Sequence, residues 1–237
     1  MKASPGLARA EARESEAEMA GHAVVCDAAG ALYLPGENVL VVSDLHLEKG
    51  AAFARRLMPV PPYDTAVTLS RLAAVIGRYA PRLVISLGDA FHDGDGARLM
   101  PDPFRAGLEA QMAGRQWIWI SGNHDPEHPD GFEGETMEEF SLGALRFRHI
   151  PRDGAAPGEI AGHVHPAVRV ALRGQVVRRP CFVDDGTRML MPAFGAYTGA
   201  VSLGRSGYAR HFRWEETIFR LLGRDRIYAF PSRLVVG

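Results

Sequence analysis

Apolar residues are grouped along the chain in blocks that predict three buried strands separated by two helices. The strands are expected within residues 38–47, 82–89 and 116–125, where apolar runs typical of strands covered on both faces end in polar residues. The first helix, residues 63–79, places five apolar side chains on one stripe at helical spacing: Val67, Leu69, Leu72, Val75 and Ile76. The second helix is expected over residues 102–115. This β-α-β-α-β order predicts parallel strands joined by right-handed crossovers.

The same two helices carry recognisable end signals. Asp64 is expected to cap the first helix, and Asp102, which is followed by a proline, is expected to open the second. Pro81 is expected to end the first helix, because a proline cannot continue it.

The segments outside this unit have a different pattern. Residues 1–20 are rich in Ala, Glu and Arg and show little apolar periodicity, which predicts a flexible N-terminal tail, whereas residues 21–237 are expected to form a single domain. A hairpin is expected around residues 27–30, and a turn with a last strand within residues 221–230. After about residue 135, short strands separated by Gly, Pro and Asp predict antiparallel ribbons. The expected fold class is α/β, with two mixed β-sheets packed face to face and flanked by helices.

Each strand of the β-α-β-α-β unit ends in side chains that can bind metal ions. The three strands are followed, in order, by Asp44 and His46, by Asp89, and by Asn123, His124 and Asp125. Farther along the chain, short predicted strands are followed by His149 and by the pair His163 and His165. Functional sites of open parallel sheets assemble at the carboxyl ends of the strands, so we expect these side chains to lie in one place.

The donor types favour two metal ions over one. Two carboxylates, one amide oxygen and four imidazoles besides His124 are too many for one tetrahedral zinc, and no cysteine takes part. The set suits two ions that share a bridging carboxylate, and mixed nitrogen and oxygen donors are compatible with Mn, Fe, Zn, Co or Ni. Two ions about 3.5–4 Å apart can clamp a phosphoryl group and lower the pKa of water held between them. The expected reaction is hydrolysis of a phosphate ester.

The ordered set Asp-x-His, Gly-Asp, Gly-Asn-His-Asp, His and Gly-His-x-His resembles the calcineurin-like metallophosphoesterase superfamily. The flanking sequences, among them LPGENVLVVSDLHLEKGAAFARR, GHVHPAVRV and LMPAFGAYTGA, resemble the DNA-ligase-associated branch, the PdeM-type DNA-damage-response endonucleases. The resemblance runs from about residue 32 to residue 201, with a further similarity in residues 221–230. It implies a metallophosphoesterase-type sandwich, two divalent ions with manganese foremost, and DNA endonuclease activity.

Carried over to this sequence, the resemblance implies a role for each donor. One ion would be bound by Asp44, His46 and His165, the other by Asn123, His149 and His163, and Asp89 would bridge the two. His124 would bind neither ion and would donate a hydrogen bond or a proton to the leaving oxygen of the substrate.

One position departs from the pattern of the protein serine/threonine phosphatases in the same superfamily. This chain resembles those enzymes, but they carry an Asp three residues after the bridging Asp and an Arg directly after it. In them the Asp orients the catalytic His. Here those positions hold His92 and Asp93. We expect Asp93 or Asp125 to orient His124 instead, with His92 either beside the site or in a solvated loop. The departure argues against a phosphoprotein phosphatase and is compatible with a diesterase.

Composition limits how the chain can contact a nucleic acid. Its formal net charge of −1 gives no overall attraction to a polyanion, so such a partner requires a local basic surface. Several arginines near the metal-binding motifs either contact DNA phosphates or belong to ordinary solvated surface: Arg55, Arg56, Arg146, Arg148, Arg152, Arg169, Arg173, Arg178 and Arg179. Phe194 and Tyr197 either stack on a base of single-stranded DNA or pack within the protein.

The two cysteines and the lack of long apolar runs indicate in which cellular compartment the protein is found. Cys26 and Cys181 form no CxxC pair and are expected to be packed thiols in a reducing environment. No apolar run reaches the ~20 residues of a membrane helix. We expect a cytoplasmic protein without a membrane partner.

The expected function is binuclear-metal-dependent phosphodiester hydrolysis. The resemblance implies a DNA endonuclease, with single-stranded DNA as substrate, that acts in DNA repair beside an ATP-dependent ligase, a helicase and an exonuclease-like protein. A hydrolase of small phosphodiesters, such as cyclic nucleotides or nucleotide pyrophosphates, could use the same site. A non-catalytic scaffold module on the same fold is the alternative of another class, and it would be expected to have gaps in the ligand set, whereas this sequence has none.

Overall fold

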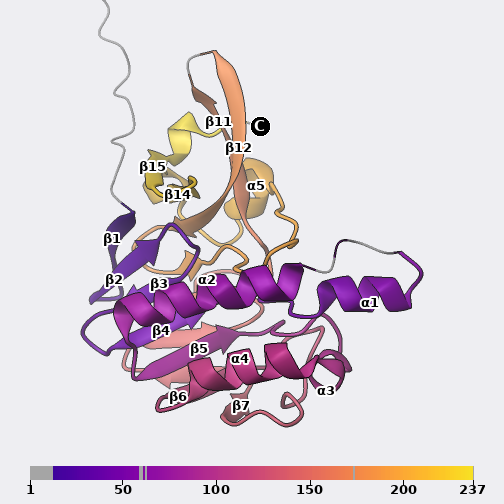
Figure 1. The fold of residues 1–237 in the computed structure, drawn as a ribbon. Helices are drawn as coiled ribbons and strands as arrows, with labels where there is room; N and C mark the ends of the chain where they lie inside the picture. Colours follow the sequence, from indigo (N-terminus) through magenta and orange to yellow (C-terminus); the bar gives the residue numbers. More distant parts are fainter. Residues whose placement is uncertain (1–12, 59–60, 62, 173, 237) are drawn as a thin grey trace, which may run out of the picture.

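Two mixed β-sheets pack face to face, and helices cover the outer face of the first sheet (Figure 1). The computed structural model describes residues 13–58, 61, 63–172 and 174–236. The arrangement confirms the expected α/β fold class.

The first sheet contains the predicted β-α-β-α-β unit. Its strands, in their order across the sheet, are β1 (Glu14–Met19), β2 (His22–Asp27), β3 (Leu32–Leu34), β4 (Val39–Val42), β5 (Leu83–Leu87), β6 (Gln116–Ile120) and β7 (Glu135–Met137). Strands β4 to β7 are parallel, and β1 to β4 are antiparallel, which confirms the expected hairpin of β2 and β3. Every residue of β4 and β5 is buried, because both faces of these strands are covered.

The predicted N-terminal tail of residues 1–20 is too long. Glu14–Met19 form β1, which pairs with β2 along its whole length. In this strand Ser15 and Met19 are buried, whereas the three glutamates are exposed. The segment therefore has the two-residue period of a strand, which its small and polar residues conceal in the sequence. Residues 1–12 lie outside the described residues.

The second sheet combines hairpins with parallel strands. Its strands are β8 (Glu139–Leu142), β9 (Leu145–Arg148), β10 (Glu159–Ala161), β11 (Ala167–Leu172), β12 (Gln175–Asp184), β13 (Met189–Leu190), β14 (Ile218–Leu222) and β15 (Ile227–Pro231). The order is β15-β14-β12-β13-β10-β9-β8, with β11 paired to β12. The expected antiparallel ribbons are present as β8–β9, β11–β12 and β14–β15, whereas β10 pairs in parallel with both β9 and β13, which makes the sheet mixed, as expected. Residues 149–158 connect β9 to β10, and this connection is long enough for the chain to cross back and run parallel to β9. The short strands and turn residues of the sequence do not show which direction each strand takes.

The helices lie mainly beside the first sheet. They are α1 (Lys49–Arg55), α2 (Asp64–Tyr79), α3 (Gly96–Leu99), α4 (Asp102–Met112) and α5 (Gly204–Tyr208), with the 3-10 turns η1 (Trp214–Glu216) and η2 (Ser232–Leu234). Four members of the predicted stripe on α2 are buried, but Val67 is 46% exposed. Both predicted caps are one residue off, because Tyr63 and Pro101 hold the cap positions. The Asp64 carboxylate instead accepts the backbone N–H of Gly50 and so ties α1 to α2.

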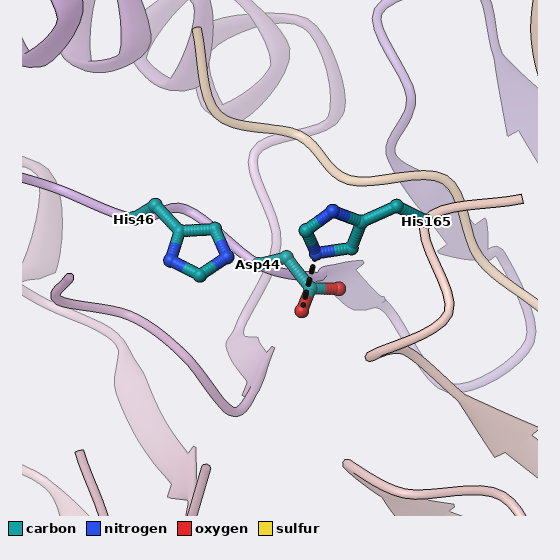
Figure 2. Close-up of side chains that lie close together, drawn as sticks. All are labelled: Asp44, His46 and His165. Atoms are coloured by element: carbon teal, nitrogen blue, oxygen red, sulfur yellow. Dashed lines mark ion pairs between the residues drawn. The ribbon is translucent and has the colours of Figure 1, made fainter. Parts of the chain in front are cut away.

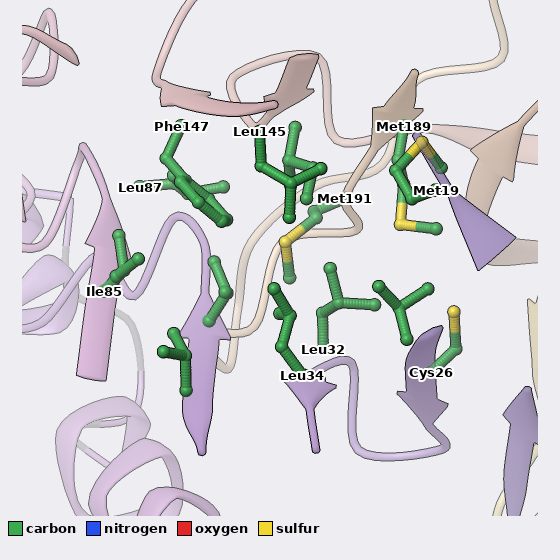
Figure 3. Close-up of a cluster of buried hydrophobic side chains, with 14 of the residues drawn as sticks. Met19, Cys26, Leu32, Leu34, Ile85, Leu87, Leu145, Phe147, Met189 and Met191 are labelled. Atoms are coloured by element: carbon green, nitrogen blue, oxygen red, sulfur yellow. The ribbon is translucent and has the colours of Figure 1, made fainter. Parts of the chain in front are cut away.

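Two apolar layers make the carboxyl ends of β4, β5 and β6 a fixed platform. Figure 3 shows the layer between the sheets, where Leu34 and Ile85 of the first sheet face Phe147 and Met189 of the second. A second layer joins α2 and α4 to the outer face of the first sheet. Among the described residues, none of the helices combines the length and apolarity needed to cross a bilayer.

Candidate metal centre

Asp44, His46 and His165 form the first group of donors (Figure 2). One ligand atom from each lies within 4.8 Å of the others. Asp44 and His46 follow β4, while His165 follows β10 in the other sheet. His165 Nε2 lies 3.1 Å from Asp44 Oδ1. The fold therefore brings together side chains that are far apart in the sequence, as the motif predicts.

Asp89, His149 and His163 form the second group, with ligand atoms again within 4.8 Å of one another. His149 Nδ1 hydrogen-bonds to the Leu87 carbonyl oxygen at 2.8 Å, which turns Nε2 toward the other donors. Asn123 Oδ1 lies 2.9 Å from this Nε2, and His163 Nδ1 lies 3.1 Å from it. With Asp89 Oδ1, which is 3.4 Å away, three donor side chains converge on this ring nitrogen.

Asp89 lies between the two groups. Its Oδ2 is 3.8 Å from His46 Nε2 in the first group, and its Oδ1 is 3.4 Å from His149 Nε2 in the second. The backbone N–H of His124 also donates to Oδ1, at 2.9 Å. This carboxylate is therefore in the position of a ligand shared by two ions.

Burial and neighbouring charges shift the pKa values of the donors in different directions. Burial lowers the pKa of His46 to about 3, so this ring is neutral, as a metal ligand must be, and burial together with the neighbouring His149 lowers that of His163. Burial alone would raise the pKa of Asp89, but a hydrogen bond and positive charge from His149 hold it well below its usual range. Burial acts to lower the pKa of His149, yet its hydrogen bond to Asp89 and the charges of Asp44 and Asp89 raise it.

The backbone is strained at most of the donors. Five of them have left-handed conformations, with positive φ angles: Asp44 (53°), His46 (43°), Asp89 (46°), His163 (67°) and His165 (47°). Non-glycine residues rarely adopt this region, and each instance costs on the order of 1–3 kcal/mol. Strain concentrated at five donors indicates that the surrounding fold holds these loops in place to aim their side chains inward.

Two glycines allow the loops to approach closely. A Cβ at Gly88 would lie 2.5 Å from the His149 ring, and Gly88 itself has φ +71°. A Cβ at Gly122 would overlap the backbone nitrogen of Asp89 and lie 2.5 Å from Asp125 Oδ1. Both positions require a residue without a side chain.

Ser43 is a site residue that the sequence motif did not identify. Its hydroxyl donates to Asp44 Oδ2, and the backbone N–H of His163 donates to the same oxygen at 3.1 Å. The other oxygen, Oδ1, is left facing His165. The available signal was the position of Ser43, a buried polar residue that directly follows the apolar run of β4.

His124 lies at the rim of the centre, with 42% of its side chain exposed. Its Nε2 is 3.9 Å from Asp89 Oδ2, and its Nδ1 is 3.0 Å from the carbonyl oxygen of His92. The His92 ring stacks on that of His124, with centroids 5.3 Å apart. His92 therefore lies beside the site and orients His124 through its backbone.

The two carboxylates expected to orient His124 have other partners. Asp93 accepts two hydrogen bonds from Arg55, at 2.9 and 3.0 Å. Asp125 Oδ2 accepts the backbone N–H of Phe91, while Oδ1 is buried and has no partner among the described residues. Burial and the nearby Asp89 charge raise the pKa of Asp125 to about 7. Asp125 holds the loop after β5, and among the described residues neither it nor Asp93 is hydrogen-bonded to the His124 ring.

Some of the candidate nucleic-acid contacts form ion pairs within the protein, and others are exposed. Arg55 is paired with Asp93, and Arg148 is paired with Glu139 at 2.9 Å. Arg56 is exposed. Phe194 is fully buried and packs against the Arg71 guanidinium, so it cannot stack on a base, whereas Tyr197 is 47% exposed.

Comparison with known proteins points to one family. The model of the calcineurin-like phosphoesterases matches residues 37–167, a range that includes all the predicted donors. The fold is similar to that in the crystal structure of Pseudomonas putida nuclease MPE, with a TM-score of 0.72 and 28% sequence identity over 92% of this chain and 100% of that chain. No curated protein sequence matches the chain.

Proposed function

This chain belongs to the calcineurin-like phosphoesterase family and is a metal-dependent phosphoesterase, and we propose that it is a nuclease with a two-metal centre. The observation that carries the proposal is the position of Asp89, whose two oxygens face two separate groups of donors. We also propose that both sheets act as a single domain, because they share one apolar layer.

The residues present fit two divalent ions. His46 Nδ1 is buried and unpaired among the described residues, and three donor side chains converge on His149 Nε2. One ion would be held by Asp44, His46 and His165, the other by Asn123, His149 and His163, and Asp89 would contact both. When bound, the ions neutralise the charge of the phosphoryl oxygens and lower the pKa of the attacking water. Nitrogen and oxygen donors suit Mn²⁺, our proposed ion, and also Fe, Zn, Co or Ni.

His124 is the proposed proton donor to the leaving oxygen. Its Nδ1 is occupied by the His92 carbonyl, which leaves Nε2 directed toward the Asp89 carboxylate and the donor groups. A histidine in this position can deliver a proton as the phosphorus–oxygen bond breaks. The backbone hydrogen bond fixes the ring, so a carboxylate is not needed for this purpose.

A nucleic-acid substrate is supported by the similarity to a solved nuclease and by the open side of the centre. His124 and His163 are exposed, so a long strand can reach the donors. A cavity of about 620 Å³ lies beside His124, and its lining combines apolar residues such as Phe91 and Pro126 with the carboxyl groups of Asp93, Asp125, Glu127 and Asp130. This lining suits a base next to the scissile bond, whereas its carboxyl groups would repel a phosphate. We propose single-stranded DNA as the substrate.

The biological setting that we propose comes from the sequence resemblance. The phrases around the donors support a role in DNA repair, in the cytoplasm, beside an ATP-dependent ligase, a helicase and an exonuclease-like protein. Co-purification of the tagged chain with a ligase or helicase after DNA damage would test this setting.

The activity is tested with metal-stripped protein to which Mn²⁺ is added back. Single-stranded DNA, duplex DNA, bis(p-nitrophenyl) phosphate and p-nitrophenyl phosphate are offered in parallel. We expect internal cleavage of single-stranded DNA and turnover of the diester, both dependent on Mn²⁺. Turnover of small diesters without cleavage of either DNA would overturn the nuclease assignment and favour a small-diester hydrolase. Failure of the chain to bind Mn²⁺, together with the absence of any turnover, would favour a scaffold module.

A further inference from the structure

The strands β11 and β12 extend together away from the two packed sheets (Figure 1). The two strands of this hairpin pair in antiparallel register. One face packs on apolar side chains through Val168 and Val170, which are buried. Alternate residues point to the other face. That face, which we call the arginine face, consists of the exposed residues Arg169, Ala171, Val176 and Arg178.

Arg169 and Arg178 lie directly opposite each other on this face. Like charges in directly opposed positions destabilise a strand pair. The Arg178 guanidinium donates to neutral groups, the Ser202 hydroxyl at 3.1 Å and the Ala200 carbonyl. Neither guanidinium contacts a carboxylate in the part of the chain that the structure describes. The charge of the pair is therefore uncompensated among the described residues.

The sequence around the hairpin is depleted of acidic residues. Residues 160–214 contain eight arginines and two carboxylates, although the whole chain has a net charge of −1. The two carboxylates are already paired, Asp184 with Arg220 and Asp185 with Arg213. The positive potential of this region is thus local and is directed at solvent.

The arginine face is connected to the metal centre through residues 199–202. The Arg178 side chain contacts Ala200 and Ser202. On the other side, His165 Nδ1 is 3.1 Å from the Gly199 carbonyl oxygen, and the backbone N–H of Val201 donates to the His165 carbonyl at 2.8 Å. The arginine face therefore adjoins the loop that carries the donor His165.

We propose that the arginine face binds the sugar–phosphate backbone of the nucleic acid outside the scissile bond. This inference rests on the proposed nuclease function and names the surface that holds the flanking strand. A phosphate between Arg169 and Arg178 compensates the repulsion that the empty hairpin carries, and guanidinium groups match phosphate oxygens in bidentate geometry. Contacts of this kind position a strand without reading its bases.

Arg169 offers the cleanest variants, because its side chain has no hydrogen bond or ion pair among the described residues, whereas Arg178 contacts Ser202 and Ala200. Arg169→Gln removes the charge. Arg169→Glu places a carboxylate opposite Arg178, which creates a favourable cross-strand pair in the protein and repels phosphate. Arg82→Gln is the matched control, since Arg82 is exposed at the amino end of β5, the opposite end from the donors.

The Mn²⁺-loaded full chain is assayed on a single-stranded oligonucleotide over a range of salt concentrations, and on bis(p-nitrophenyl) phosphate. We expect Arg169→Gln to raise the oligonucleotide KM about fivefold and to reduce the log–log salt slope by about 0.7, with the small diester unaffected. Arg169→Glu should raise KM further while its thermal midpoint stays level or rises. Arg82→Gln should match the wild type.

Three results would overturn the inference. If the wild type cleaves DNA and Arg169→Gln leaves KM and salt slope unchanged, the arginine face is not used and the nuclease assignment stands. If turnover of the small diester falls in parallel with that of the oligonucleotide, the arginine only supports the fold near His165. If the wild type cleaves no nucleic acid, the inference fails together with the proposed function.

Discussion

Asp89 and His149 meet at the centre of the site, where Asp89 Oδ1 lies 3.4 Å from His149 Nε2. Both side chains are buried, and each shifts the pKa of the other toward the charged form. The same carboxylate faces His46 through its second oxygen. A single carboxylate therefore supplies negative charge to both groups of donors.

This arrangement predicts that Asp89→Asn lowers the metal content of the chain. The amide keeps the size of the carboxylate but loses its charge and one acceptor oxygen. We expect the affinity for Mn²⁺ to fall by about 10-fold or more, because even the loss of a residue that only orients a metal ligand lowers the affinity by about this much. Equilibrium dialysis followed by elemental analysis measures the bound ions per chain. Asp93→Asn is the control, because Asp93 lies on the same loop but pairs with Arg55. An unchanged metal content in Asp89→Asn would contradict the shared position of this carboxylate.

His124→Ala is expected to reduce activity in a way that depends on the leaving group. General acid catalysis contributes roughly 10²–10⁴-fold where the leaving oxygen needs a proton. The loss should therefore be large for a dinucleotide and much smaller for bis(p-nitrophenyl) phosphate, whose leaving oxyanion is stable without a proton. Steady-state kinetics on both substrates measure this difference. An equal loss on both would show that His124 positions the phosphate and does not donate a proton.

His22→Ala serves as the control for this comparison. His22 lies at the start of β2, outside the donor groups, and its Nδ1 is 2.6 Å from Glu37 Oε1. It should show the same ratio between the two substrates as the wild type.

The donors could be predicted from the sequence because their position follows from chain direction. Asp44, Asp89 and Asn123 each come directly after a buried parallel strand, and parallel strands end at one edge of a sheet. The apolar runs that identify these strands are strong signals, since both faces are covered. Chain direction does not specify how the side chains are oriented.

Orientation depended on contacts that no local pattern encodes. The ring of His124 is held by the carbonyl oxygen of His92, a backbone group that every residue has. The positive φ angles of Asp44 and His165 are imposed by loops from different sheets that meet at the centre. Similarly, β9 and β10 run parallel because of how the second sheet packs, and their short sequences fit either direction.

Gly122→Ala is expected to disrupt the metal centre, whereas Gly94→Ala is not. A Cβ at Gly122 would overlap the backbone of Asp89, so the two donor loops must separate, at a cost on the order of 1–3 kcal/mol. At Gly94, in the nearby loop after β5, a Cβ would meet nothing within 4 Å. Thermal midpoints recorded with and without Mn²⁺ test the pair. We expect Gly122→Ala to lose most of the rise in thermal midpoint that Mn²⁺ produces. If Mn²⁺ raised the midpoint of Gly122→Ala as much as that of Gly94→Ala, the close approach of the two loops would be refuted.

Asp185 is expected to stabilise the fold in a pH-dependent way. Burial alone would raise its pKa, but hydrogen bonds from Thr187, and from the backbone N–H groups of Arg213 and Arg188, hold the pKa below its usual range. A depressed pKa means that the carboxylate stabilises the folded state above the unfolded pKa of about 4, and that this contribution is lost as the pH falls through the lower, folded value. Both oxygens accept: Oδ1 from Thr187 and Oδ2 from Arg213.

Asp185→Asn leaves only one acceptor oxygen, so one of these N–H groups loses its partner. We expect the free energy of unfolding to fall by about 1–3 kcal/mol at pH 7 and by clearly less at pH 3, which lies below the unfolded pKa of about 4, so that the unfolded wild-type carboxyl takes up a proton. Urea titrations at both pH values measure the difference. Asp153→Asn, at an exposed position, should have little effect at either pH. A loss of the same size at pH 3 and pH 7 would mean that Asp185 acts through its shape and that its charge contributes nothing.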